Sequence, residues 1–109
     1  MEDEENSNIR DYEIYLEQEI VVMLRDGRYL YGIMKSFDQF NSIALDMVVE
    51  RIFHEKKYAE KKHELFVIRG ENISMIGLGS PPVEDDLDKE DFDILSIEIS
   101  KSLSELQVS

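Results

Sequence analysis

The sequence predicts a small, mostly β domain, made of one short N-terminal helix followed by five short strands. Three observations support this fold class: runs of β-branched and aromatic residues, turn signals between them, and glycines within the runs that mark bends. Helical and strand patterns do not alternate along the chain, which argues against a parallel α/β sheet. We expect a strongly bent antiparallel sheet, or small open barrel, followed by a C-terminal helical extension.

The 109 residues are enough for one small domain, and the negative charge lies mainly at the two ends. The formal net charge is -13, of which -4 belongs to residues 1–8 and -7 to residues 84–109. The part between them is therefore close to neutral. We expect a disordered acidic tail at 1–8, the folded domain at 9–80 and an acidic extension at 81–109.

The folded domain is expected to begin with a helix. Asn8 is a suitable N-cap, and after it apolar residues recur at near-helical spacing at Ile9, Tyr12 and Leu16. We expect this helix to end near Glu17. The β-branched run from Glu19 to Leu24 then predicts the first strand.

The next two turns connect three predicted strands. Asp26-Gly27 is a strong hairpin signal, and it leads into a second strand at 29–37. Gly32, in the middle of that strand, predicts a bend or bulge because it has no side chain to pack. After a polar turn at 38–41, the alternation of apolar residues predicts a third strand at 43–53.

The remaining part of the domain reads as a polar connection and two short strands. The charged stretch 56–63, with lysines at 56, 57, 61 and 62, is expected to be a solvated loop or to contact phosphates. Strands are expected at 65–68 and 73–78, joined only by Arg69-Gly70-Glu71-Asn72.

The C-terminal extension starts after Pro81-Pro82 and is expected to be helical from about residue 88. Its apolar residues follow steps of three and four, at Phe92, Leu95, Ile99, Leu103 and Leu106. An edge strand is the alternative, because Leu95, Ile97 and Ile99 also alternate with polar residues. A helix this short must dock on another surface to be stable.

Two polar turns of the predicted sheet carry groups that suit single-stranded RNA. One displays Phe40 among small hydrogen-bonding residues, and the other displays Arg69 beside Gly70. An aromatic ring and a guanidinium suit an unstacked base, and glycine lets a ligand approach the backbone. The alternatives are a hydrophobic turn residue packed on the sheet, and a surface arginine paired with Asp38 or Glu71.

Several classes of protein are disfavoured by what the sequence lacks. It has no cysteine, which excludes disulfides, and its longest apolar run, from Ile20 to Leu24, is too short to cross a bilayer. The acidic N-terminus is unlike a secretory signal, so we expect an intracellular protein without a membrane association. His54 and His63 lack zinc-site spacing, and no nucleophile–base arrangement is present, so we expect neither metal, cofactor nor enzyme activity.

The motifs resemble those of a known family. The first Sm motif is resembled by Asp26-Gly27, Gly32, Asp38, Leu45 and Glu50, and the second by Phe66 to Ile73. The resemblance covers about Leu16 to Gly79. The chain is thus similar to the Sm-like (Lsm) family, and most like the subunit specific to the cytoplasmic ring of mRNA decay. That closer resemblance is carried by Asp38-Gln39-Phe40, Val49 to Ile52, Lys57 to Glu60 and Phe66 to Asn72.

The resemblance implies assembly and function. It implies the Sm fold, and a ring with six other Lsm subunits that binds the 3′ end of oligoadenylated mRNA. A docked decapping-activator protein would then promote decapping and 5′-to-3′ decay in the cytoplasm, including P-bodies. The alternative subunit belongs to the nuclear ring, which binds the 3′ oligo-U end of U6 snRNA in splicing. A second alternative is an acidic interaction protein that does not contact RNA.

The resemblance also implies roles for individual residues. Phe40 would stack on a base, Arg69 would pack on its other face, and Gly70 would give access to the backbone. Asp38 would orient the turn or Arg69. The family has an asparagine that reads the base edge where this chain has Ser42, and an asparagine stands one place earlier, at Asn41. Either Asn41 swings in, or the nucleotide is held mainly by stacking. The C-terminal extension would dock across one ring face and restrict the central hole.

Overall fold

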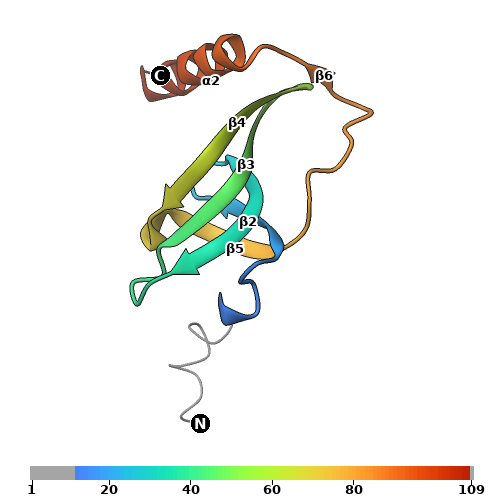
Figure 1. Cartoon of the computed structure of the whole chain (residues 1–109). Helices are drawn as coiled ribbons and strands as arrows, with labels where there is room; N and C mark the ends of the chain where they lie inside the picture. The colour runs from blue at the N-terminus through green and yellow to red at the C-terminus, as the bar shows by residue number, and fades with distance from the viewer. Residues whose placement is uncertain (1–11, 109) are drawn as a thin grey trace.

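The computed structural model describes residues 12–108 and shows that the β-branched runs form strands of one bent sheet (Figure 1). β1 (Glu19–Leu24), β2 (Tyr29–Phe37) and β5 (Ile73–Leu78) have the predicted bounds. β3 (Ile43–His54) ends one residue later than expected. The prediction of a mostly β fold with a strongly bent sheet is therefore confirmed.

The sheet places the first and last strands of the domain side by side. Its strand order is β5-β1-β2-β3-β4-β6, with antiparallel pairing throughout except between β4 and β6. At Gly32 the register between β2 and β3 shifts, as predicted. A side chain there would lie 3.0 Å from the carbonyl oxygen of Asp46 and 3.1 Å from a methyl group of Val48, so glycine permits the close approach of the two strands. Asp26-Gly27 forms the predicted tight turn, with Gly27 at a φ of 96°.

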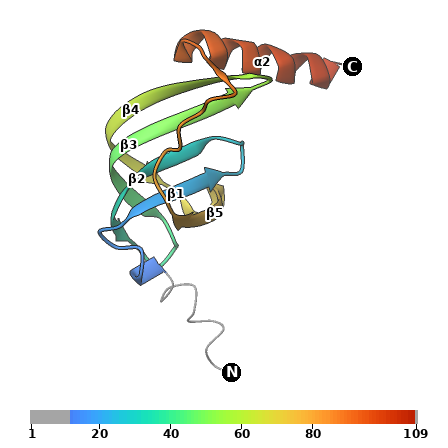
Figure 2. The ribbon, with the colours of Figure 1, turned by 90° about the vertical axis from the view of Figure 1, so that its right-hand side faces the viewer.

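The core lies inside the curve of the sheet, seen edge-on in Figure 2. Alternate residues of β1, β2 and β3 point inward, because successive side chains of a strand face opposite sides. They pack with Ile43, Ile68 and Ile73, which flank two polar turns, residues 38–42 and 69–72. We call these two turns the rim turns. The buried members of this cluster are Ile20, Val22, Leu24, Leu30, Met34, Ile43, Leu45, Val48, Ile68 and Ile73.

The expectation of a solvated loop at 56–63 is wrong. Only Glu55 and Lys56 form the turn, and Glu55 adopts a φ of 57° that lets the chain reverse there. The strand β4 (Lys57–Ile68) includes most of this stretch, so the short strand predicted at 65–68 is only its last third. The charged residues alternate between two faces of the strand, and many of them contact other parts of the chain. This long-range pairing is what the local pattern concealed.

The predicted helix from Asn8 to Glu17 lies partly outside the described residues. In the described part, Tyr12 and Glu13 are helical and a turn follows, so no helix continues to Glu17. Leu16 then forms an isolated bridge with Met34 of β2. The chain is therefore joined to the sheet just before β1 begins.

The C-terminal extension forms a short strand and a helix that lie against the β3–β4 hairpin. β6 (Asp88–Lys89) pairs with the start of β4 and is a sixth strand beyond the five predicted. The helix α2 (Phe92–Val108) confirms the helical alternative over the edge strand, although it begins at Phe92 rather than near residue 88. Leu95 is fully buried against Ile52 and Ala59 of the hairpin. Among the described residues, no helix is long and apolar enough to span a membrane.

Candidate nucleic-acid interface

The turn between β2 and β3 is held by the carboxylate of Asp38. Its Oδ1 accepts hydrogen bonds from the backbone N–H groups of Phe40 (2.9 Å) and Ser42 (3.0 Å). The turn also has backbone hydrogen bonds between Asp38 and Ser42 and from Asn41 to Asp38. Asn41 has a φ of 65°, a left-handed conformation that asparagine tolerates better than most residues. Asp38 therefore stabilises the turn rather than pairing with Arg69.

The turn before β5 packs directly on this first turn. A methyl group on the α-carbon of Gly70 would overlap the carbonyl oxygen of Phe40 and lie 3.0 Å from that of Asn41. Only glycine allows the two backbones to come this close. Residues far apart in the sequence are therefore joined at one edge of the sheet, as the sequence predicted for its two polar turns.

The second turn has its own support from the β1–β2 hairpin. Residues 70–72 form a single 3-10 turn. Arg25 donates from its side-chain Nε to the carbonyl oxygen of Glu71 at 2.7 Å, and its backbone N–H donates to the carbonyl oxygen of Asn72 at 2.9 Å. Sequence reasoning missed Arg25 because nothing local connects it with a turn so far along the chain.

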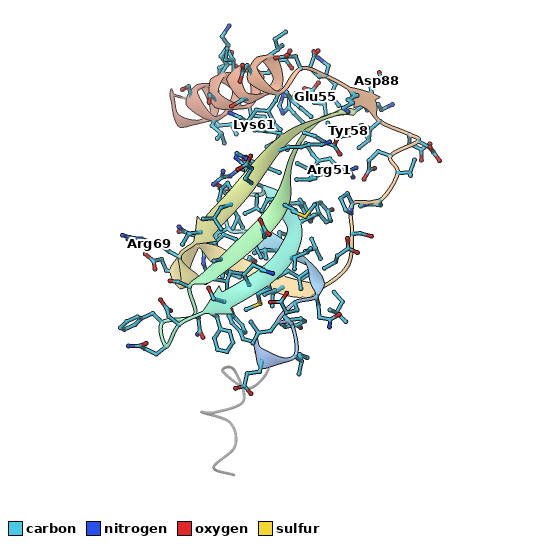
Figure 3. The ribbon with its side chains drawn as sticks, viewed as in Figure 1. Arg51, Glu55, Tyr58, Lys61, Arg69 and Asp88 are labelled. Carbon is cyan, nitrogen blue, oxygen red and sulfur yellow. The ribbon has the colours of Figure 1, made fainter. Side chains whose placement is uncertain are left out.

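Both predicted ligand-binding side chains are exposed. Phe40 is 73% exposed, so it is not a hydrophobic turn residue packed on the sheet. Arg69 projects from the same edge of the molecule, as Figure 3 shows, with 78% of its side chain exposed. Among the described residues, Arg69 forms one ion pair, with Glu71 at 3.7 Å, and both partners are exposed. Exposed pairs of this kind are worth about 0 to 1 kcal/mol, so Arg69 remains available to a ligand.

The position of Asn41 bears on how a base could be read. Its side-chain Oδ1 is buried and has no hydrogen-bond partner among the described residues. Asn41 lines a shallow pocket with Gly70 and with the first residues of β5, on one side of the turn. In this conformation the amide oxygen of Asn41 is enclosed.

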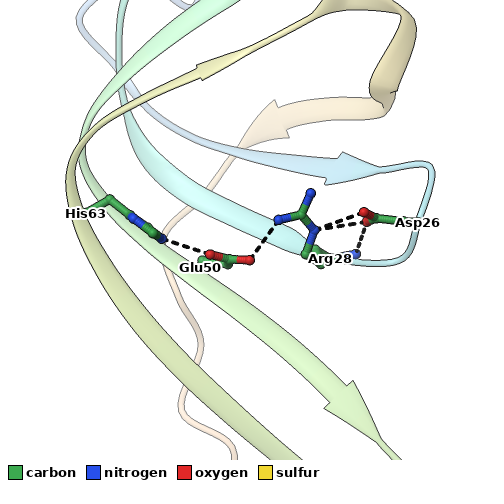
Figure 4. Close-up of polar contacts among 4 residues, drawn as sticks. All are labelled: Asp26, Arg28, Glu50 and His63. Carbon is green, nitrogen blue, oxygen red and sulfur yellow. Dashed lines mark hydrogen bonds and ion pairs between the residues drawn. The ribbon is translucent and has the colours of Figure 1, made fainter. Parts of the chain in front are cut away.

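A charged network that sequence reasoning did not identify joins the turn between β1 and β2 to β3 and β4 (Figure 4). The carboxylate of Glu50, only 6% exposed, accepts from Arg28 at 2.9 Å and from His63 Nε2 at 2.8 Å. Arg28 also pairs with Asp26 at 3.0 Å. Burial alone lowers the pKa of Arg28, but the hydrogen bonds and charges of Glu50 and Asp26 raise it more, so its pKa is raised overall. Strand alternation was the available signal, because it places Glu50 inward between Val48 and Ile52.

The fold and the paired turns define the class of protein. The chain aligns with the crystal structure of a heptameric archaeal Sm protein at a TM-score of 0.51 and 30% identity, over 71% of this chain and 98% of that one. The fold is therefore the Sm fold, as the motifs predicted. Residues 10–78 match the LSM domain, and the chain belongs to the LSM domain family.

Curated relatives refine this membership. The LSM1 subunit of the LSM1-LSM7 complex of Saccharomyces cerevisiae is 46% identical over 78 residues, which are 70% of this chain and 42% of that protein. The Sm-like protein LSM8 of Arabidopsis thaliana is 41% identical over 66 residues, 60% of this chain and 67% of that protein. The predicted resemblance to LSM1-type subunits is confirmed. The chain spans about half the length of the LSM1 relatives that it matches.

Proposed function

We propose that this chain is an RNA-binding, non-enzymatic subunit of a cytoplasmic ring formed with six other Lsm subunits. Its turns bind the 3′ end of oligoadenylated mRNA. The ring concentrates in P-bodies, where a decapping activator docked on it promotes decapping and 5′-to-3′ decay. The observation that carries this proposal is the contact between two distant turns, which places an exposed ring and an exposed guanidinium at one edge of the sheet.

In this proposal one nucleotide is held between Phe40 and Arg69. The aromatic ring stacks on one face of the base, the guanidinium packs on the other, and Gly70 lets the nucleotide approach the backbone. Stacking on an aromatic side chain is worth about 1 to 3 kcal/mol per base, so one subunit binds weakly and a ring binds usefully. Because Asn41 Oδ1 is enclosed and Ser42 is short, we infer that stacking dominates over reading of the base edge.

Two strand edges supply a reason for ring assembly: β5 is an outer strand, and β6 covers β4 only at Lys57 and Tyr58. Along β4 the apolar side chains of Leu65 and Val67 are exposed, and along β5 those of Met75 and Leu78 are exposed. An outer strand with unpaired backbone groups and exposed apolar side chains favours pairing with another strand. When each subunit pairs its β4 side with the β5 side of a neighbour, a closed ring leaves no unpaired edge.

The C-terminal extension gives the ring a second property. We infer that α2 continues beyond its own hairpin and lies over one face of the ring, where its acids repel RNA from the central hole. Ile97 and Leu103, each 56% exposed, are available for contact with neighbouring subunits. Deletion of residues 84–109 then lengthens the RNA segment protected from nuclease, and an unchanged footprint contradicts this role.

The RNA-binding role is tested with alanine substitutions at the interface. We expect Phe40→Ala together with Arg69→Ala to weaken binding of a fluorescein-labelled oligoadenylate by about tenfold or more, measured by fluorescence anisotropy. Val83→Ala is the matched control, since Val83 is also largely exposed but lies outside the two turns and the strand edges proposed for assembly. Equal affinity of the double variant and the control would overturn the proposal.

Native mass spectrometry of the tagged protein from cells separates the two rings. Six small homologous chains are expected to co-purify, including those of the decay ring. Recovery of the U6-binding nuclear assembly instead favours the alternative suggested by the similarity to LSM8. Recovery of unrelated basic proteins, lost when the acidic tails are removed, favours the acidic interaction protein.

A further inference from the structure

The far half of the β3–β4 hairpin, residues 51–63, projects from the sheet at the opposite end from the two rim turns (Figure 3). This half is basic, although residues 43–68 as a whole carry no net charge. Residues 51–63 carry five lysines and arginines against two acids, a net charge of +3. Half-buried aromatic rings accompany these cations: Phe53 and Tyr58 lie stacked with their centroids 6.3 Å apart. Cations interleaved with aromatic rings form the usual surface for single-stranded nucleic acid.

The acidic extension covers this projection. Residues 84–98 carry eight acids and one lysine, a net charge of -7. Glu84 contacts Arg51 on one face of the hairpin, and Leu95 of α2 packs on Ile52 and Ala59 on the other face. Between them, β6 pairs with the edge of the hairpin, and Figures 1 and 2 show this path of the chain. The two segments are therefore complementary in charge and in contact on both faces.

The contacts of the extension match those that an RNA strand makes. Two of its carboxylates pair with cations of the hairpin: Glu84 is 3.3 Å from Arg51, and Glu98 is 3.3 Å from Lys57. Its one aromatic ring, that of Phe92, lies under the ammonium group of Lys61 at 5.5 Å. Anionic groups on cations, with an intervening ring against a lysine, are the two kinds of contact that a single strand provides.

We propose that the β3–β4 hairpin is a second surface for single-stranded RNA, separate from the rim, and that the acidic extension covers it as an intramolecular competitor. Lys57 and Lys61 bind phosphates on one face, and Arg51 with Tyr58 binds a phosphate and a base on the other. An RNA strand reaches this surface only by displacing Glu84, Glu98 and the helix that carries Glu98.

The extension has few anchors besides two backbone hydrogen bonds at β6, from Asp88 to Lys56 and from Glu90 to Tyr58. Its apolar anchor is small, consisting of Leu95 with Phe92 and Ile99 packed on Ile52 and Ala59. The ion pair between Lys57 and Glu98 joins side chains that are both more than one-third exposed, so it contributes little and is screened by salt. A tethered competitor of this kind lowers apparent affinity for RNA without abolishing it.

The test weakens the cover in the full chain and measures binding away from the rim. In the background Phe40→Ala/Arg69→Ala, we add Glu84→Gln/Glu98→Gln and titrate a fluorescein-labelled oligouridylate of about 15 nucleotides. We expect about tenfold tighter binding than in the background, with a steep dependence on salt. Because the rim is disabled, failure here does not count against the rim, and failure of the rim does not count against the hairpin.

Asp85→Asn/Asp86→Asn is the matched control, since it changes the net charge equally at two exposed acids for which no ion pair is found in the described part of the chain. An equal gain from this control, or no gain from Glu84→Gln/Glu98→Gln, overturns the proposal. Adding Lys57→Gln/Lys61→Gln to the uncovered variant returns affinity to the background. Equally tight binding of polyglutamate overturns the assignment to nucleic acid.

A measurement on the unaltered chain keeps the proposal testable if a variant fails to fold. Saturating oligouridylate is expected to increase hydrogen exchange of backbone amides in 93–106, because RNA on the hairpin displaces α2. Unchanged exchange of these amides in the presence of bound RNA overturns the proposal.

Discussion

The rim turns and the β3–β4 hairpin use similar chemical groups in opposite ways. At the rim, Arg69 has 78% of its side chain exposed beside an exposed ring. On the hairpin, the side chain of Arg51 is 6% exposed, lies 5.7 and 5.2 Å from the centroids of two tyrosine rings, and pairs with Glu60 at 2.6 Å. Residue type alone therefore does not define a binding site. What matters is whether the chain already supplies the partner.

Among the expected effects, the largest is the difference in the free energy of unfolding between the variants Arg51→Ala and Arg69→Ala. Arg51→Ala leaves Glu60 and Glu84 without their shared cation, and breaking a buried ion pair costs about 3 to 5 kcal/mol. Arg69→Ala is the matched control and is expected to change the free energy of unfolding by less than about 0.5 kcal/mol. Urea unfolding followed by circular dichroism measures both. Similar losses for the two variants would remove the distinction drawn between the two regions.

The close contact between the two rim turns depends on Gly70, and Gly77 offers a comparison. Gly70→Ala pushes a methyl group into the carbonyl oxygens of Phe40 and Asn41, and such overpacking costs about 1 to 3 kcal/mol. Gly77→Ala is its control, because no atom lies within 4 Å of the position that its methyl group would take. The midpoint temperature of thermal unfolding and the affinity for oligoadenylate should both fall for Gly70→Ala and stay unchanged for Gly77→Ala. Retention of RNA affinity by Gly70→Ala would show that contact between the turns is dispensable.

The turn between β2 and β3 offers a smaller effect. Asp38→Ala removes the acceptor of two backbone hydrogen bonds, each worth about 1 kcal/mol net, and loosens the loop that presents Phe40. We expect RNA affinity to fall several-fold and the free energy of unfolding to fall by up to about 2 kcal/mol. Asp38→Asn keeps one side-chain acceptor and should recover part of the loss. Anisotropy titrations compare the two variants with the parent. Affinities of both variants equal to that of the parent would exclude this role for the carboxylate.

Acid should release the hairpin's cover slightly. Burial raises the pKa of Glu60, but the hydrogen bond and charge of Arg51 lower it more, so its pKa lies below the usual value near 4.5. The stability from this pair is therefore present above pH 4.5 and is lost as pH falls through the lowered pKa. The amides of Asp88 and Glu90 donate to the carbonyl oxygens of Lys56 and Tyr58, beside the pair between Lys89 and Glu60. Their hydrogen-exchange protection factors should fall below pH 4.5 in the parent and less in Glu60→Gln. An identical pH dependence in both would contradict this coupling.

Local patterns predicted the elements whose contacts are local. Asp26-Gly27 set the first hairpin, β-branched runs set β1, β2 and β5, and Gly32 set the bend between β2 and β3. The two rim turns were also recognised, because a short polar stretch between two β-forming runs indicates a turn. Exposure of Phe40 could then be read only from the structure.

The first half of β4 was missed for a physical reason. In the sequence, Lys57 and Lys61 resemble residues of a solvated loop. In the structure Lys57 contacts Glu98 and Lys61 contacts Phe92, and both partners are more than 30 positions later in the chain. Arg25 was missed at the rim for the same reason, since its hydrogen bond to Glu71 spans 46 positions. Charged residues whose partners are distant in sequence carry little local signal, although strand alternation placed Glu50 inward.

The most direct test of the central claim is photochemical crosslinking of 4-thiouridine-containing RNA to the full chain in its assembly, followed by peptide mass spectrometry. We predict crosslinks in the two peptides that contain Phe40 and Arg69, and their loss in Phe40→Ala/Arg69→Ala while the assembly stays intact. Undiminished crosslinking at both turns in that variant would contradict the claim that this ring and this guanidinium hold the base.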